Sequence, residues 1–231
     1  RAHTPAQSGK VYFCSRGATG WTNTVIESKN SGGDVTSLAY NPVTGAPSAC
    51  YRAGTTLRFA YRSGANWIKE TADSSAYARY SALAFDAQGN PAIAYCDDAD
   101  GDGWLDSLWL ARKQGSSWTT QMLDGPVVGY GVHAAIAFDP TTQSFVLSHA
   151  SDPSPRLWSW NGSAWVVDSP PESAEYIFGC GLVISPDGTA NLAYSIDSEQ
   201  RAARRSPGGA WTIELIDAEY VWPFNTGARL T

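Results

Sequence analysis

Four carboxylates crowd into one short segment of this chain. Asp98, Asp100 and Asp102 alternate along it, Gly103 permits a sharp turn, and Asp106 follows at the ninth place. Calcium takes roughly six to eight oxygen ligands, and a tight loop of alternating aspartates brings several oxygens to one point. Without a cation, carboxylates this close together would repel one another. The segment therefore predicts a structural Ca²⁺ site. Its expected ligands are Asp98, Asp100, Asp102, Asp106 and the backbone carbonyl of Trp104.

The aspartate segment follows the EF-hand-type pattern with one departure. Trp109 stands at the twelfth place, where such loops carry a bidentate glutamate. Asp97 or Asp106 could supply the remaining oxygens. An ordinary acidic, solvated insertion is the alternative, and the full Asp-x-Asp-x-Asp-Gly-x-x-Asp pattern favours calcium over it. A weak calcium loop fills best where calcium is abundant, so we expect a secreted, periplasmic or cell-surface protein.

The other titratable residues do not assemble into a catalytic site. Of the three histidines, His3 lies in a terminal segment, and His133 and His149 have no motif that links them to a nucleophile or a metal. The sequence also contains no Gly-x-Ser-x-Gly, no His-Glu-x-x-His and no phosphate-binding glycine loop. We therefore expect a protein that is not an enzyme.

A long-period repeat runs through the whole sequence. Its markers are five tryptophans spaced 46, 51, 47 and 46 residues apart, namely Trp21, Trp67, Trp118, Trp165 and Trp211. Between them, short apolar or alternating runs are separated by Gly, Pro, Asn or Asp, which predicts four strands per repeat. Four-stranded repeats of about this length are typical of β-propeller blades, in which these tryptophans would act as spacers between blades.

The alignment of the repeats also gives one histidine a structural interpretation. One position of the second strand is aromatic throughout, and it is occupied by Tyr51, Tyr95, His149 and Tyr194. We therefore expect His149 to replace a packing tyrosine rather than to act as a base.

The two ends of the chain predict five blades. The sequence opens in two strands, near Val11–Ser15 and Trp21–Ile26, and stops inside another, at 227–231. If the ends meet, one blade is shared between the N- and C-termini, which removes exposed sheet edges. We expect a single all-β domain over residues 1–231, a five-bladed β-propeller of four-stranded antiparallel blades. A fragment of a longer propeller is the alternative, and since the chain begins with Arg1 we expect a processed or excised piece.

The hairpin before four of the spacer tryptophans carries a Gly-x-x-Trp pattern, as in Gly64–Trp67, Gly115–Trp118 and Gly162–Trp165, and the first copy, Gly17–Trp21, has one extra residue. This pattern resembles a degenerate Asp-box, the hairpin that recurs in sialidase-like propellers, although the Ser-x-Asp of that motif is missing. The size and the count of five blades are similar to those of tachylectin-type lectins. The resemblance covers the whole chain as repeat architecture and implies a fold rather than a function. A sialidase-like site would also need an arginine cluster, and the arginines here are scattered over different strands.

One face of the predicted propeller carries the longer connections. In a four-stranded meander, the loops between the second and third strands and the connections between blades emerge on the same side, and loops on a rigid scaffold often carry function. Aromatic residues recur in these connections, and their flat rings could stack on sugar rings. Packing between blades is the alternative for each of them singly. The candidate ligand-binding residues are Tyr77, Tyr80, Tyr130, Tyr176, Tyr220, Trp222 and Phe224.

Composition limits the partners. The chain is 43% hydrophobic, only 16% charged, and carries a net charge of −6, which argues against nucleic acid as a partner. No apolar stretch is long enough to insert into a membrane. We expect a lectin-like module that binds a glycan or another extracellular ligand. A protein-interaction domain of a larger surface assembly is the alternative, and a glycoside-processing enzyme is a more distant one.

Overall fold

The computed structural model describes residues 9–28, 36–74, 77–98, 107–125, 133–151, 153–174, 177–197 and 199–218. Within these ranges every regular element is a β-strand, and the strands form five antiparallel sheets. None of the described residues belongs to a helix that is long and apolar enough to span a membrane.

Each sheet is a meander of consecutive strands, which we call a blade. The first blade has two described strands, β1 (Val11–Gly17) and β2 (Gly20–Glu27). The second has β3 (Ser37–Tyr40), β4 (Pro47–Ala53), β5 (Thr56–Ser63) and β6 (Asn66–Asp73). The third has β7 (Arg79–Phe85), β8 (Pro91–Asp97), β9 (Ser107–Gln114) and β10 (Ser117–Asp124). The fourth has β11 (Ala134–Asp139), β12 (Ser144–His149), β13 (Arg156–Trp160) and β14 (Trp165–Asp168). The fifth has β15 (Ile177–Ile184), β16 (Ala190–Ile196), β17 (Glu199–Arg205) and β18 (Trp211–Asp217).

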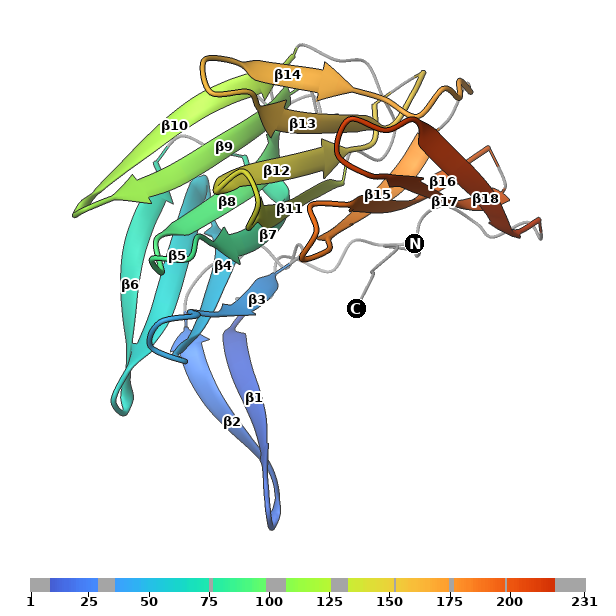
Figure 1. Ribbon diagram of the computed structural model, residues 1–231. Helices are drawn as coiled ribbons and strands as arrows, with labels where there is room; N and C mark the ends of the chain where they lie inside the picture. The colour runs from blue at the N-terminus through green and yellow to red at the C-terminus, as the bar shows by residue number, and fades with distance from the viewer. Residues whose placement is uncertain are drawn as a thin grey trace.

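The blades follow one another around an arc, from β1–β2 to β15–β18 (Figure 1). The first strands of successive four-stranded blades contact each other in order, β3 with β7, β7 with β11, and β11 with β15. This radial repetition, with the first strands innermost, is the arrangement of a β-propeller. The chain is therefore a five-bladed β-propeller, as predicted. The strands expected to complete the first blade fall within residues 1–8 and 219–231, which lie outside the described ranges.

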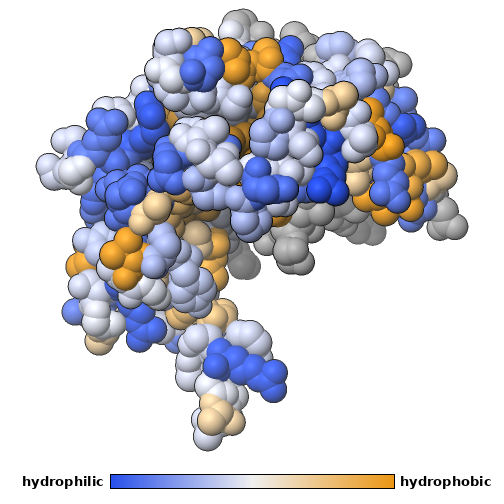
Figure 2. All heavy atoms as spheres, in the orientation of Figure 1, coloured by the Kyte–Doolittle hydropathy of each residue, from blue (hydrophilic) through white to orange (hydrophobic). Residues whose placement is uncertain are grey.

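The hydrophobic core lies between neighbouring blades. One cluster joins the second and third blades through Phe59, Leu83 and Ile93, and another joins the third and fourth through Leu110 and Leu147. The second strands are the most buried, and every residue of β8 is buried. The surface in Figure 2 is mostly hydrophilic, with small hydrophobic areas scattered over several blades.

The tryptophans act as spacers where two described blades meet. The ring centre of Trp67 lies 5.4 Å from that of Phe13, and the ring centre of Trp118 lies 5.4 Å from that of Phe59. In each pair the phenylalanine comes from the third strand of the preceding blade. Trp21 departs from this role, because it is 69% exposed and joins none of the hydrophobic clusters among the described residues.

Candidate functional site

The spacer tryptophans have a regular partner across the hairpin, with one exception. In four blades the paired residue on the third strand is a cation, and these residues are Arg16, Arg62, Lys113 and Arg205. In the fourth blade the spacer is Trp165, and the residue paired with it is Trp160. The chemistry at this end of the fourth blade therefore differs from that of the other four.

In two junctions the cation neutralises a carboxylate of the preceding blade. Lys113 Nζ lies 2.6 Å from Glu70 Oε1, and the indole N–H of Trp118 donates to Glu70 Oε2 at 2.9 Å. Arg205 forms the corresponding ion pair with Asp168. Glu70 and Asp168 occupy the same repeat position, three residues after the spacer tryptophan. These ion pairs fix the outer part of each junction.

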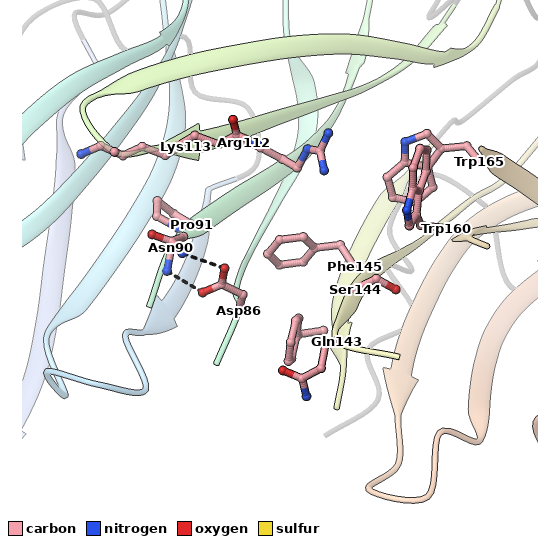
Figure 3. A pocket seen from close by; sticks show the side chains of 13 residues that line it. Asp86, Asn90, Pro91, Arg112, Lys113, Gln143, Ser144, Phe145, Trp160 and Trp165 are labelled. Atoms are coloured by element: carbon pink, nitrogen blue, oxygen red, sulfur yellow. Dashed lines mark hydrogen bonds between the residues drawn. The ribbon is translucent and has the colours of Figure 1, made fainter. Parts of the chain in front are cut away.

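The junction between the third and fourth blades has lost both members of this pair. Gln121 stands where the carboxylate would be, and Trp160 stands where the cation would be. A cavity of about 500 Å³ lies here, which we call the seam cavity. Its lining from the third blade is Asp86, Asn90, Pro91, Arg112, Lys113, Gln114 and Gly115. Its lining from the fourth blade is Phe138, Gln143, Ser144, Phe145, Trp160 and Trp165 (Figure 3).

One wall of the seam cavity is a tight turn between β7 and β8. Asp86 accepts hydrogen bonds from the backbone N–H of Gln88 at 3.0 Å, the backbone N–H of Asn90 at 2.7 Å and the side-chain amide of Asn90 at 2.8 Å. Gly89 permits the turn with its positive φ of 81°. Because both carboxylate oxygens of Asp86 are engaged, the aspartate serves mainly to hold this wall in place.

The opposite wall is aromatic. The ring centres of Trp160 and Trp165 lie 5.8 Å apart in an edge-to-face arrangement, and those of Phe138 and Phe145 lie 5.6 Å apart in the same manner. Trp165 and Phe145 also pack against the buried cluster around Leu110, whereas Trp160 is 38% exposed. The wall thus combines anchored rings with one accessible indole, a surface suited to stacking on an apolar face of a ligand.

Arg112 on β9 brings a cation to the cavity. Successive side chains of a strand point to opposite faces, and in Figure 3 Arg112 reaches toward Trp160 and Trp165, whereas Lys113 points the other way. No residue in the described ranges forms a hydrogen bond or ion pair with the Arg112 guanidinium. The seam cavity therefore combines an aromatic wall with an unpaired cation.

A second cavity, of about 480 Å³, occupies the equivalent junction between the second and third blades. Tyr61 stands in it at the repeat position of Arg112, and Lys113 stands at the position of Trp160. The ammonium of Lys113 is already paired with Glu70. The two cavities therefore share a place in the repeat but differ in their chemistry.

Both cavities lie at the end of the blades opposite the predicted ligand face. They are lined by the short turns between first and second strands and by the hairpins between third and fourth strands. Reasoning from loop length therefore missed them. The replacement of a cation by Trp160 opposite Trp165 was the signal in the sequence that could have revealed the seam cavity.

The structure describes two of the seven aromatic residues predicted on the long-loop face. Tyr77 is 45% exposed. Tyr80 is partly buried, has a positive φ of 49°, and packs on His133 with ring centres 3.9 Å apart. Tyr80 thus makes a packing contact, which the sequence analysis gave as the alternative to ligand binding for each of these aromatic residues. The remaining five lie outside the described ranges, and they are Tyr130, Tyr176, Tyr220, Trp222 and Phe224.

The predicted calcium segment lies mostly outside the described residues, which include Asp98 but not 99–106. Asp98 is only 3% exposed, and Asp97 beside it is also buried. Burial raises the pKa of Asp97, and so do the negative charges of Asp73 and Asp98. Among the residues that can be described, no group of three or more His, Cys, Asp or Glu side chains could hold a metal ion.

The aligned second-strand residues tie neighbouring blades together. Tyr51, Tyr95, His149 and Tyr194 are all fully buried. The Tyr95 hydroxyl donates to Asp73 Oδ2 at 2.6 Å, and the Tyr194 hydroxyl donates to Glu172. His149 thus occupies a packing position, as predicted, and burial lowers its pKa.

Comparisons with known structures match this geometry to propeller proteins. A complex of SapL1 lectin with α-methyl fucoside superposes with a TM-score of 0.61 at 12% identity, covering 89% of this chain and 75% of that one. A mutant of AofleA from Arthrobotrys oligospora superposes with a TM-score of 0.58 at 14% identity, covering 88% of this chain and 64% of that one. A mutant of NanB sialidase from Streptococcus pneumoniae superposes with a TM-score of 0.59 at 11% identity, covering 89% of this chain and 57% of that one.

These similarities show the fold. The chain covers only part of each matched structure, and for AofleA and NanB that part is less than two thirds of the length. Neither a protein-family profile nor a curated protein sequence matches this chain.

Proposed function

We propose that this propeller is a non-enzymatic carbohydrate-binding module and that the seam cavity is its binding site. The observation that carries the proposal is the pairing of Trp160, an accessible ring on an anchored aromatic wall, with the unpaired Arg112 across a cavity of about 500 Å³. Sugars present apolar C–H faces and many hydroxyl groups. An aromatic ring can cover such a face while an arginine donates hydrogen bonds to the oxygens.

Two further observations support this proposal over a catalytic role. The SapL1 lectin binds a methyl fucoside on a scaffold of the same fold, although its low identity carries no ligand over to this chain. In the seam cavity the carboxylate is that of Asp86, whose oxygens are held by the turn from Gln88 to Asn90. A glycosidase uses two carboxyl groups, one as acid and one as base or nucleophile.

The long-loop face remains a second proposed contact surface. Tyr77 is exposed there and is available for stacking. Its contribution is separable from that of the seam cavity because the two lie at opposite ends of the blades.

The test is a glycan array with purified wild-type protein, followed by titration of the best ligands. Trp160→Ala should weaken binding at least tenfold, whereas Trp21→Ala, which removes an exposed tryptophan of the first blade, should leave it unchanged. Tyr77→Ala reports the long-loop face. Binding that neither Trp160→Ala nor a second cavity variant, Phe145→Ala, weakens would place the site elsewhere. Release of label from a panel of aryl glycosides would contradict the non-enzymatic role.

We further propose a structural Ca²⁺ ion in the segment 98–106 and a location outside the cytoplasm. The support is the aspartate pattern itself, together with the position of Asp97, whose pKa is raised by burial and by the negative charges of Asp73 and Asp98. A divalent cation close to these groups would favour their charged forms.

A further inference from the structure

We infer that the seam cavity selects saccharides that carry an anionic group, a carboxylate or a sulfate ester, and that Arg112 binds this group beside the Trp160 ring. The inference rests on the proposed carbohydrate-binding function and adds the charge of the ligand. It follows from a comparison of Arg112 with the arginines and the lysine that form ion pairs in this and neighbouring blades.

Arg112 differs from three arginines of the fourth and fifth blades in having no counter-ion among the described residues, and it differs from Arg204, at the same repeat position, in being partly buried. Arg156 pairs with Asp124, Arg201 with Glu172 and Glu199, and Arg205 with Asp168. Arg112 is only partly exposed, and none of the described residues pairs with its guanidinium. A planar guanidinium presents parallel N–H donors that match the oxygens of a carboxylate or a sulfate. An arginine held in a cavity with these donors unused is therefore suited to an anionic ligand.

The carboxylate in the lining does not neutralise Arg112. In Figure 3 Asp86 points toward Asn90, and its oxygens accept three hydrogen bonds from Gln88 and Asn90. The other lining cation, Lys113, is directed to the neighbouring junction and paired with Glu70. The position of the missing carboxylate on β10 is held by Gln121, which is uncharged. The described residues thus offer no counter-charge for Arg112, and we infer that the ligand supplies it.

The aromatic wall limits what kind of anion fits. A free inorganic anion would leave Trp160 and the Phe138–Phe145 pair uncovered, whereas a sugar ring bearing the anionic group covers them. The protein carries a net charge of −6, so its overall field repels anions, and the attraction must be local. At the related cavity Tyr61 replaces Arg112. The lining cations there are Arg62, whose Nε donates to the Gly64 carbonyl at 3.1 Å, and Lys113, which is paired with Glu70.

The experiment uses matched saccharides that differ in charge alone. One pair is a hexuronate oligosaccharide and the same oligosaccharide with its carboxyl groups reduced to alcohols. The other is a sulfated oligosaccharide and its desulfated form. Affinities are measured by calorimetry for the wild type and for Arg112→Gln, Arg112→Lys and the control Arg204→Gln. Arg204 occupies the same position of β17 and is exposed.

At least one charged saccharide should bind the wild type tenfold or more tightly than its neutral partner. Arg112→Gln should remove that difference while neutral saccharides keep their affinity within about threefold. Arg112→Lys should keep part of the difference, and Arg204→Gln all of it. The pair that shows the preference identifies the group as carboxylate or sulfate.

Equal binding of charged and neutral partners, with Trp160→Ala still weakening both, would overturn this inference and leave the proposed function standing. A charge preference that survives Arg112→Gln would also overturn it. No binding by any saccharide, with folding verified by circular dichroism, would overturn the proposed function as well.

Discussion

His149 Nε2 lies 3.0 Å from Asp124 Oδ2, and this contact joins the second strand of the fourth blade to the end of the last strand of the third. Arg156 pairs with the same carboxylate from β13. Tyr95 makes the equivalent contact with Asp73 between the second and third blades. One of these buried contacts between blades is therefore made by a histidine, a side chain whose ordinary pKa lies near 6.5.

This histidine contact should make stability fall in mild acid. Burial lowers the pKa of His149 below its ordinary value near 6.5, although Asp124 opposes the shift. The unfolded chain then binds more protons than the folded chain below about pH 6.5, so the free energy of unfolding decreases as the pH falls through this range. Burial also lowers the pKa of His133, to about 4, which acts in the same direction. Urea unfolding between pH 7.5 and pH 4.5 measures the effect.

His149→Tyr should reduce this pH dependence, because the tyrosine does not titrate between pH 4.5 and pH 7.5. Tyr194→His is the matched opposite change, because it places a histidine at the same position of the fifth blade. It should make the loss in acid steeper. Identical slopes for the wild type and His149→Tyr would mean that the histidine contact does not titrate in this range.

Gly89→Ala should destabilise the protein by about 2 kcal/mol or more, because two costs combine. Gly89 has a positive φ of 81°, and an added Cβ would lie 2.8 Å from Asn41 Oδ1. Asn41 cannot easily move, since it donates to the Gly89 carbonyl and accepts from the N–H groups of Val43 and Thr44. Gly64→Ala is the control, because Gly64 has a similar φ of 60° but open space around its Cα. It should cost only about 1 kcal/mol. Equal losses for both variants would contradict the steric argument.

Much of the fold could be predicted from the sequence because neighbouring blades pack against each other through residues at the same repeat positions. A tryptophan such as Trp67 or Trp118 must fill the space beside an aromatic residue of the preceding blade, so its spacing reports the blade length. The first two strands were placed correctly for the same reason. Burial of His149 followed from its alignment with tyrosines.

The seam cavity could not be found in this way. Its distinguishing feature is the joint loss of a carboxylate at Gln121 and a cation at Trp160, two positions on different blades. An alignment of repeats shows which residues are equivalent, but not which strands face each other across a junction. The direction of Arg112 also depends on the side-chain alternation of β9 within the folded sheet. Loop length does not point to this cavity, because short turns on rigid strands form it.

Glu70→Gln should lower stability by roughly 1 kcal/mol or somewhat more, because Glu70 serves two partners at a partly buried junction. It accepts from Lys113 at 2.6 Å and from the Trp118 indole at 2.9 Å. A double-mutant cycle with Lys113→Met isolates the ion pair. Lys69→Met is the control, since the Lys69–Glu27 pair is longer, at 3.3 Å, and its lysine is more exposed. A coupling energy near zero for Glu70 and Lys113 would show that the ion pair does not hold this junction together.

Removal of calcium should lower the melting temperature if the aspartate segment holds the ion. Asp98 is buried at the start of that segment, beside Asp97 and near Asp73, and the loss of a cation would leave their charges uncompensated. Differential scanning calorimetry with excess calcium and with chelator measures the shift, which we expect to be several degrees. Asp100→Ala should abolish the response, whereas Asp187→Ala, in an exposed turn of the fifth blade, should keep it. A melting temperature that chelator does not change would rule out a stabilising calcium site.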